Sequence, residues 1–384
     1  MKICIISQDF YPSIGGVAAH VFNLSRFLAR ANNEVIVLSA RNSLSEPFIE
    51  YVEGVKIVRF FTPDISKIRG LFFVVQGSVY IFLKSIFNRF DVIHWHNLFA
   101  DTIIAWFGLA DKFVFTNHTS KFLEMVDAGS GKKFYKLFFS KVDEIIAPSQ
   151  ELADKSREFL NFDKENIHYI PNGVDTDLFI PLSDARERKE KRSKFFEKYP
   201  GKENSFFVFC PRRLEAKNGV HFLVGAAINI VQKKKNIFFA DAGNDATPDY
   251  AKNLKERVIS SGIKEEFIFL GPIKNTEMKN LYQICDLVIL PSLMEATSIA
   301  GLEAMSCGVP IIGTRVGGIP DIIMDGKTGF LISPSSSREI EEKILVAAES
   351  EDLLISMGKN AREFVLNNFS WLKIVSRTLD VYGK

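Results

Sequence analysis

Short apolar runs and longer amphipathic stretches alternate along the first half of the chain. The short runs are rich in Val, Ile and Phe and have the length of buried strands. Between some of them, apolar residues recur at helical spacing, as in His20–Arg30. This alternation is typical of a parallel sheet with helices on both faces. The predicted strands are Ile3–Ser7, Glu34–Ser39, Val55–Phe60, Val92–His96, Phe113–Asn117 and Glu144–Pro148.

The alternation starts again in the second half, which predicts an α/β protein with two doubly wound parallel-sheet domains. The break falls in Pro171–Gly201, because Pro181–Lys198 is highly charged and weakly apolar. We expect domains at 1–174 and 175–365, with a C-terminal helix in 366–384 that crosses back to the first domain. Such sheets bind substrates at the carboxyl ends of their strands, which points to the cleft between the domains. The second series of predicted strands is Ser205–Cys210, Ile237–Ala242, Phe267–Leu270, Leu287–Pro291, Pro310–Gly313 and Phe330–Ile332.

Composition and charge narrow the class of partner. The 384 residues include 48 Lys and Arg against 46 Asp and Glu, so nucleic acid is not an expected partner. The four cysteines are scattered without a CxxC pair, which indicates buried thiols in a reducing compartment. No signal-peptide pattern precedes the first predicted strand, and we therefore expect a cytoplasmic protein.

The most hydrophobic segment is Leu71–Leu83. It is too short to span a bilayer, and Gln76, Gly77 and Ser78 interrupt it, so we predict a buried helix. The alternative is a helix in peripheral contact with a membrane. Basic residues that flank the segment support this alternative: Lys67, Arg69, Lys84 and Arg89.

Motifs for cofactors and metals are weak. No GxGxxG sequence follows a predicted strand, which argues against nicotinamide or flavin dinucleotides. Asp175 and Asp177 have the spacing of a metal-binding DxD pair, but they belong to a turn followed by Phe179, and we interpret them as structural. No pair of histidines or carboxylates has zinc-ligand spacing. We therefore expect neither a cofactor nor a metal.

Two features of the first half follow predicted strands. Gly15 and Gly16 lie between a strand and a helix, where glycines let the backbone approach a ligand or simply permit a tight turn. His118 lies at the end of a candidate central strand and is placed to hydrogen-bond a substrate hydroxyl. A lone histidine is more often structural.

A cation-rich loop follows the first strand of the second half. Arg212, Arg213 and Lys217 fall within Cys210–Gly219, and such a set can neutralise phosphate oxygens. The alternative is a solvated basic loop.

The segment Pro291–Gly308 carries two glutamates, Glu295 and Glu303, separated by small or modest side chains. A helix is expected to begin near Thr297 or Ser298. The residue three positions later is not Glu or Gln, so no capping box forms and first-turn amides stay free for an anion.

Glu303 leans toward the start of this helix, because helical side chains point toward the N-terminus. There it can accept hydrogen bonds from sugar or ribose hydroxyls beside a phosphate. The structural alternative is an acid favoured by the helix dipole by about 0.3–1 kcal/mol, which accounts for Glu303 but not for Glu295.

The Glu-x7-Glu pair, with Leu302–Met305 and Gly308–Thr314 after it, resembles the retaining GT-B glycosyltransferases of family GT4. The Gly-Gly turn, His118, the Arg-Arg-Leu loop and Phe369–Trp371 follow the family's order. The resemblance implies two Rossmann-like domains that face an interdomain cleft. It also implies transfer of a sugar, with retention and without a metal, from a UDP-, GDP- or ADP-sugar to a hydroxyl of a glycan, lipid or small molecule.

The same resemblance implies residue roles. Arg213 and Lys217 neutralise the diphosphate, Glu303 binds the ribose, and Glu295 and His118 contact the sugar. The remaining donor-binding residues are Gly15, Gly16, Arg212, Gly243, Ile273, Thr297, Ser298, Ile299, Ala300, Gly301 and Leu302.

Two departures from the family pattern affect these roles. Lys217 stands five positions after Arg212 but four after Arg213, so either arginine is a candidate for the diphosphate. The aromatic-glycine pair common after the first glutamate is replaced by Ala296–Ser298, which bears on the choice of sugar.

The charges suggest a mechanism. Fixed cations and helix-end amides can stabilise the leaving diphosphate, and a same-face attack assisted by that diphosphate would retain the configuration. Two alternatives stay open: a nucleotide-sugar 2-epimerase of the same fold, and a non-catalytic sugar- or nucleotide-binding protein.

Overall fold

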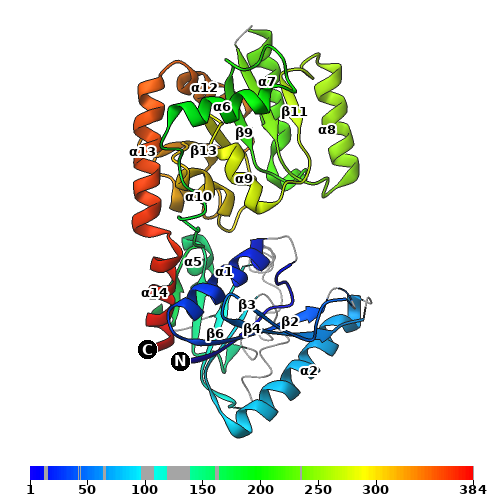
Figure 1. Ribbon diagram of the computed structural model, residues 1–384, viewed down its shortest axis with the longest axis vertical. Helices are drawn as coiled ribbons and strands as arrows, with labels where there is room; N and C mark the ends of the chain where they lie inside the picture. The colour runs from blue at the N-terminus through cyan, green and yellow to red at the C-terminus, as the bar shows by residue number, and fades with distance from the viewer. Residues whose placement is uncertain are drawn as a thin grey trace. The chain divides into compact units, whose positions relative to one another are not determined.

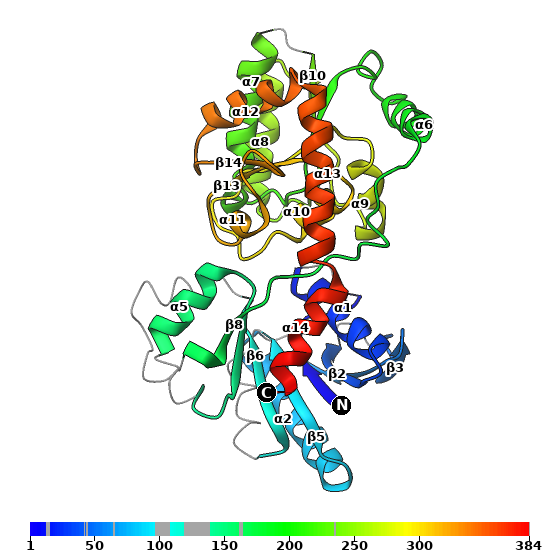
Figure 2. The same cartoon turned by 90° about the vertical axis from the view of Figure 1, so that its left-hand side faces the viewer.

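The computed structural model describes residues 1–12, 16–41, 43, 45–63, 66–96, 108–118, 139–160, 164–233 and 236–383. Its chain divides into two compact units (Figures 1 and 2). Unit 1 comprises Met1–Gly173 and Trp371–Lys384, and unit 2 comprises Val174–Ser370. The first division falls after Gly173, one residue before the predicted boundary, and the second falls after Ser370, five residues beyond the predicted one. The last helix belongs to unit 1.

Unit 1 contains an eight-stranded sheet in the order β3-β4-β2-β1-β5-β6-β7-β8. All neighbouring strands are parallel except β3 and β4. Its strands are β1 Lys2–Ile6, β2 Glu34–Arg41, β3 Ile49–Val52, β4 Val55–Phe61, β5 Phe90–His96, β6 Ala110–Thr116, β7 Glu144–Ala147 and β8 Ile167–Tyr169. Its described helices are α1 Gly16–Arg30, α2 Ser66–Phe87, α5 Gln150–Leu160, the short η2 Lys164–Asn166 and α14 Trp371–Gly383.

Unit 2 contains a fully parallel six-stranded sheet in the order β11-β10-β9-β12-β13-β14. Its strands are β9 Phe206–Cys210, β10 Ile237–Asp241, β11 Phe267–Phe269, β12 Leu287–Leu290, β13 Ile311–Thr314 and β14 Gly329–Ile332. Its helices are α6 Ala185–Phe196, η3 Ala216–Asn218, α7 Val220–Gln232, α8 Pro248–Ser260, α9 Asn275–Tyr282, α10 Ile299–Ser306, α11 Ile319–Ile322, α12 Ser337–Ala348 and α13 Glu351–Asn368.

The unit 2 sheet is covered on both faces. Along β9, Phe207 and Phe209 belong to one hydrophobic cluster, while Val208 and Cys210 belong to another. Successive side chains of a strand point to opposite faces, so each strand contributes to two cores. This double burial explains why the strands read as continuous apolar runs in the sequence.

The sequence misses two strands and one helix. β3 and β8 have only four and three residues, and Glu50 interrupts the apolar residues of the edge strand β3. The charged stretch Pro181–Lys198 contains a regular helix, α6, capped by Asp184, whose side chain accepts the amide of Arg186. A polar helix of this kind has little apolar periodicity by which to recognise it.

The prediction that the apolar segment Leu71–Leu83 is buried is wrong. The segment lies in α2, and much of its apolar surface is exposed. Within the described chain, Ile68–Phe87 is the one helix with the length and composition to cross a membrane.

Candidate functional site

Three neighbouring strands of unit 2 end at the same edge of its sheet, and predicted site residues follow each of them. β9 lies between β10 and β12. Gly243 comes after β10, and Arg212 and Arg213 come after β9. Glu295 lies in the loop that follows β12. The parallel sheet therefore gathers residues from three distant segments.

Arg212 connects two of these loops. Its Nη2 lies 2.9 Å from Glu295 Oε2 and donates a 2.8 Å hydrogen bond to Ser298 Oγ. The two side chains of the ion pair are only 11% and 18% exposed. Ser298 is the N-cap of α10, so the guanidinium lies beside the positive end of the helix dipole. Because Glu295 balances the charge of Arg212, the positive potential that remains at this helix end comes from the helix dipole.

The start of α10 leaves backbone donors available. The Ser298 hydroxyl accepts the amide of Gly301, which confirms Ser298 as one of the two predicted N-caps. Within the described chain, no protein acceptor is recorded for the amides of Ile299 and Ala300, and both residues are half-buried. Leu302, in contrast, is buried in the core. The first turn therefore presents two amides where an anion could bind.

Glu303 is buried one turn further along α10. Its Oε1 accepts a 2.8 Å hydrogen bond from Asn275 Nδ2, and its Oε2 accepts a 3.0 Å bond from the Tyr282 hydroxyl. Burial raises the pKa of Glu303 to about 7, although both hydrogen bonds act in the opposite direction. Further hydroxyl donors would favour the ionised carboxylate.

Two glycines allow the close backbone contacts that shape this edge. A Cβ at Gly243 would lie 2.0 Å from the Arg212 carbonyl oxygen. Gly317 has a φ of +53°, and a Cβ there would lie 1.5 Å from the Glu295 carbonyl oxygen. Any larger residue would displace the loop that carries Arg212 or Glu295.

Lys217 and Arg213 lie on the same loop as Arg212 but share a different partner. Lys217 Nζ is 3.3 Å from Glu215 Oε1, and Arg213 Nη2 is 3.9 Å from Glu215 Oε2. The Arg213 side chain is 59% exposed. The Lys217 carbonyl accepts a 2.7 Å bond from the amide of Leu293, which ties this loop to the one after β12.

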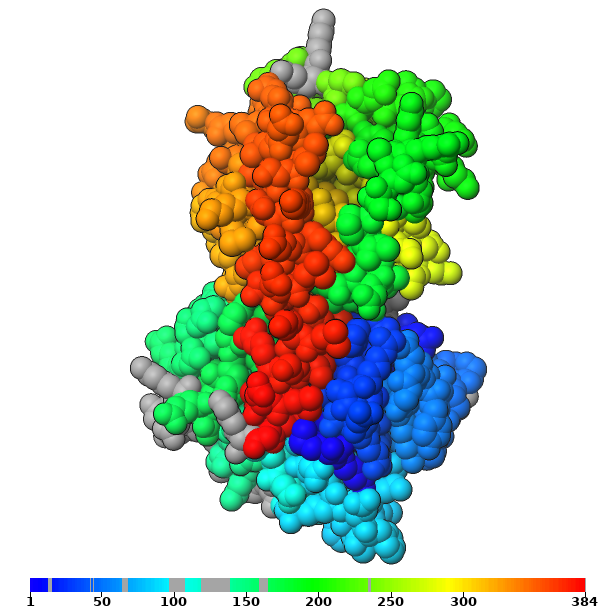
Figure 3. Space-filling view, turned by 60° about the vertical axis from the view of Figure 1, so that its left-hand side comes forward, coloured from blue at the N-terminus to red at the C-terminus, as the bar shows by residue number. Residues whose placement is uncertain are grey.

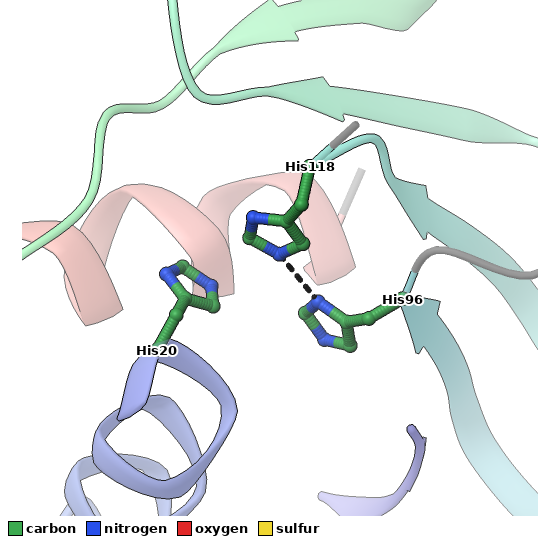
Figure 4. Close-up of side chains that lie close together, drawn as sticks. All are labelled: His20, His96 and His118. Atoms are coloured by element: carbon green, nitrogen blue, oxygen red, sulfur yellow. Dashed lines mark hydrogen bonds between the residues drawn. The ribbon is translucent and has the colours of Figure 1, made fainter. Parts of the chain in front are cut away.

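Unit 1 gathers three histidines at the ends of its central strands (Figure 4). His20 comes from α1, His96 ends β5, and His118 follows β6. His96 Nδ1 and His118 Nε2 share a 2.9 Å hydrogen bond. The His20 ring packs against His118 with a centroid distance of 4.5 Å. One nitrogen of each residue lies within 4.8 Å of the others, a grouping that could hold a metal ion.

Burial keeps these imidazoles neutral at pH 7. It lowers the pKa of His20 to about 4, against a weaker opposing interaction with the Asn172 side chain. It also holds the pKa values of His96 and His118 well below their ordinary range, and the neighbouring histidines lower them further. A neutral imidazole offers one donor and one acceptor, so His118 can bind a hydroxyl but carries no charge.

The C-terminal helix supports the histidines. His94 Nδ1 lies 2.6 Å from the Tyr382 hydroxyl, and His94 Nε2 lies 2.7 Å from Thr116 Oγ1. The ring of Trp371 packs against His20 at a centroid distance of 5.4 Å. Figure 3 shows α14 beside α1 on the surface of unit 1. The return of the chain to unit 1 therefore completes the surroundings of the cluster.

The other predicted positions have varied surroundings. Gly16 begins α1 with open space where its Cβ would be, whereas Gly15 lies outside the described residues. Thr297 is buried, and Ile273 is partly buried against the core of unit 2. Asp175 Oδ1 accepts the amides of Asp177 and Leu178, which confirms that the DxD sequence is a structural turn.

Several contacts at these sites have no signal in the sequence. Asn275 and Tyr282 bind Glu303 from a separate helix, and Glu215 pairs with two cations. His20 and His96 join His118 only because β1, β5 and β6 are neighbours. Such partners are set by strand order, which residue spacing does not reveal.

Two family models match the chain. One is described as "Glycosyl transferases group 1" and matches residues 191–364, and the other is described as "Glycosyltransferase Family 4" and matches residues 14–178. N-acetyl-alpha-D-glucosaminyl L-malate synthase of Bacillus anthracis is 25% identical over 387 residues, covering 97% of this chain and 94% of that protein. One component of human phosphatidylinositol N-acetylglucosaminyltransferase is 24% identical over 394 residues, covering 100% of this chain and 76% of that protein.

A solved structure supports the fold. Anabaena Alr3699/HepE, determined in complex with UDP and glucose, has a TM-score of 0.79 at 19% sequence identity. The match covers 100% of this chain and 99% of that chain. The fold is therefore GT-B, with two parallel-sheet α/β domains, as the sequence predicts.

Proposed function

This chain belongs to the group 1 glycosyltransferases and is a sugar-transferring enzyme, and we propose that its donor is a nucleotide-diphospho-sugar that reacts with retention of configuration. The donor site is the carboxyl edge of the unit 2 sheet. The observation that carries this proposal is the contact of Arg212 with both Glu295 and the N-cap of α10.

The diphosphate binds at the start of α10. The Ile299 and Ala300 amides and the Arg212 guanidinium supply donors and positive charge at that point. Lys217 adds a second cation from a loop that is bonded to the β12 loop. Charge-assisted hydrogen bonds of this kind are the strong ones, and they strengthen as the leaving diphosphate gains charge.

Arg212, rather than Arg213, is the diphosphate arginine in this proposal. Arg212 contacts the N-cap Ser298, whereas the ion-pair partner of the exposed Arg213 is Glu215. Arg212 also stands five positions before Lys217, the spacing common in the family.

The nucleoside and the sugar lie on either side of the diphosphate. Glu303 accepts the ribose hydroxyls, with Asn275 and Tyr282 holding its carboxylate in place. Glu295 accepts hydroxyls of the transferred sugar and is oriented by Arg212. HepE was determined with UDP, so uridine is the first base to test.

His118 contacts the transferred sugar from unit 1. Its ring is held by the bond to His96, and as a neutral imidazole it orients a hydroxyl without adding charge. The acceptor hydroxyl attacks the anomeric carbon on the face that the diphosphate leaves. The leaving phosphate oxygen takes the hydroxyl proton, so the carbon–oxygen bond to the diphosphate breaks as the new glycosidic bond forms.

No metal is required in this scheme, because Arg212, Lys217 and the helix amides neutralise the leaving group. We expect transfer to be unaffected by EDTA after exhaustive dialysis. Loss of activity with EDTA and its recovery with one divalent ion would contradict this, and the three histidines would then be the ligands to mutate.

The acceptor is a hydroxyl on a lipid or a glycan. A lipid is the first candidate, because the human relative is named for transfer to phosphatidylinositol. The enzyme works at the cytoplasmic side of a membrane in this proposal.

A donor screen tests the function. Thermal unfolding is measured with UDP-, GDP- and ADP-sugars, and a ligand at 100 times its Kd should stabilise the fold by about 2.7 kcal/mol. No shift with any nucleotide sugar would overturn the proposal. Incubation of the stabilising donor alone then separates transfer from epimerisation, because an epimerase forms a new sugar nucleotide without an acceptor.

A further inference from the structure

Helix α2 carries an apolar face that is exposed to solvent. Nine large apolar side chains on this helix are exposed, with Leu71 at 62% and Phe87 at 89%. They recur mainly at spacings of three and four residues, which places them on one side of the helix. The nine residues, which we call the α2 stripe, are Ile68, Leu71, Phe72, Val75, Val79, Phe82, Leu83, Ile86 and Phe87. Singly exposed apolar residues are ordinary, but a continuous patch marks a binding surface.

The opposite side of α2 is fixed to the sheet of unit 1. Phe73, Val74 and Ile81 are buried there. A Cβ placed on Gly77 would lie 4.0 Å from side chains of the sheet. The helix connects β4 to β5, and both strands belong to that sheet (Figure 1). A spanning orientation would place the two strands on opposite sides of a bilayer, which a single sheet forbids. The helix can therefore only lie along a membrane surface.

The charged residues between Asp64 and Asp91, the interval that contains α2, are all basic. No Asp or Glu occurs between Asp64 and Asp91, whereas that interval contains Lys67, Arg69, Lys84 and Arg89. Lys84 is exposed beside the stripe. Arg89 is offset by an ion pair with Asp111 at 3.1 Å. Anionic lipid headgroups complement such a rim, because basic residues near a membrane surface are attracted to its negative charge. Pairing with a second copy would bring the basic rims together.

The apolar surface continues beyond the helix at its C-terminal end. A shallow hollow of about 170 Å³ is lined by Phe82, Ile86 and Leu109, by the polar side chains of Ser85 and Arg89, and by Gly108. Leu109, on the loop before β6, therefore lies next to the end of the stripe.

We propose that the α2 stripe docks unit 1 on an anionic phospholipid bilayer. The helix lies in the plane of the membrane, with the stripe at the boundary of headgroups and acyl chains and Lys84 among the phosphates. The proposal goes beyond donor chemistry, because it does not depend on which nucleotide sugar reacts.

Vesicle sedimentation of the full chain tests the docking. We expect binding to vesicles of phosphatidylcholine mixed with phosphatidylglycerol, weaker binding to phosphatidylcholine alone, and loss of the difference at high salt. The triple variant Leu71→Ser, Val75→Ser and Phe82→Ser should bind at least about tenfold more weakly. Lys84→Gln should weaken only the binding to anionic vesicles, by about fivefold.

A matched control separates docking from general surface polarity. Ile259 and Ile355 of unit 2 are helical and 62% and 63% exposed, as Leu71 is. The double variant Ile259→Ser and Ile355→Ser should bind vesicles as the unaltered protein does. The thermal shift with donor shows whether each variant is folded, independently of docking.

A fluorescence-quenching experiment covers the case in which the triple variant fails to fold. Phe82→Trp keeps the stripe apolar, and its fluorescence should be quenched by brominated lipid, whereas that of Ile259→Trp should not. Equal quenching of both, vesicle binding that survives the triple variant, or no binding to anionic vesicles would overturn the proposal. So would a dimer in sedimentation equilibrium that the triple variant alone dissociates, because a second copy would then cover the stripe.

Discussion

Both units place polar residues at the ends of neighbouring central strands, but the chemistry differs. In unit 1, the ends of β5 and β6 carry neutral histidines that bond to each other and to Tyr382. In unit 2, the ends of β9 and β12 lead to an Arg212–Glu295 ion pair and the start of α10. One architecture therefore supports an uncharged polar cluster in one unit and a charged site in the other.

Burial explains part of this difference. It disfavours the charged form of every group, so it lowers histidine pKa values and raises that of Glu303. Arg212 and Glu295 instead form a largely buried ion pair. The charged site is consequently suited to an anionic diphosphate, and the neutral cluster to sugar hydroxyls.

Removal of the cations should have the largest effect. Arg212→Gln with Lys217→Gln should lower transfer by about 10²–10⁴-fold, because each lost charged hydrogen bond is worth about 1.5–3 kcal/mol. Steady-state kinetics and donor titration measure the loss. Arg213→Gln should cost only a few-fold. An equal loss for Arg213→Gln would show that the assignment of the diphosphate to Arg212 is wrong.

The control for these variants is Arg186→Gln with Lys264→Gln, which removes two exposed, ion-paired cations elsewhere in unit 2. Its turnover should match that of the unaltered protein. Gln at position 212 leaves Glu295 without its ion-pair partner, so thermal unfolding of the Arg212 variant must accompany the kinetics.

The neutral cluster should affect turnover more than donor affinity. His118→Ala should lower kcat by about 10²-fold, because one oriented hydrogen bond to the reacting sugar is lost, while the Kd for UDP should stay unchanged. His96→Asn keeps a polar atom near the Nδ1 position and should retain more activity than His96→Phe. Weaker UDP binding in His118→Ala would place this histidine at the nucleotide instead.

Donor affinity should depend on pH through Glu303. The pKa of Glu303 is raised to about 7, and in the proposed function the ribose hydroxyls bind its ionised form. Below pH 7 the carboxyl must first lose its proton, so the Kd for a nucleotide sugar should rise about tenfold from pH 8 to pH 6. Isothermal titration with a nucleotide sugar avoids the phosphate that titrates in free UDP. Glu303→Gln should abolish the pH dependence, and a dependence that persists would point to another group.

Stability should respond to pH in opposite directions in the two units. The folded pKa of Glu303 lies above its unfolded value of about 4.3, so its contribution is complete below that value and is lost as pH rises toward 7. The folded pKa of His20 is lowered, so its contribution is complete above about pH 6.5 and is lost as pH falls toward 4.

This is the smallest expected effect. Between pH 6.0 and 7.5, Glu303 should lower the Tm of unit 2 by about 2–4 °C relative to Glu303→Gln. Scanning calorimetry of both proteins measures it. Parallel Tm curves for the two proteins would contradict a raised pKa at this position.

Much of the fold could be predicted from the sequence because the strands are buried on both faces. β9 and β12 are apolar throughout, as is β1 after Lys2, and the bounds of all three agree with prediction to within one residue. The same signal does not reveal β3, because this edge strand has only four residues and Glu50 interrupts them. The sequence wrongly predicts a buried helix for the apolar part of α2, because its composition matches that of a buried helix. Composition does not show which side of a helix has a partner.

The sequence by itself determined which chemistry is available and where each loop begins. Glu295, Ser298 and Glu303 lie within nine consecutive residues, so strand-to-helix geometry alone relates them. The tertiary structure decided which distant groups meet. It placed Arg212 on Glu295, Asn275 and Tyr282 on Glu303, and His20 and His96 beside His118. The reason is that strand order is set by the packing of whole layers, and no single segment encodes its neighbours.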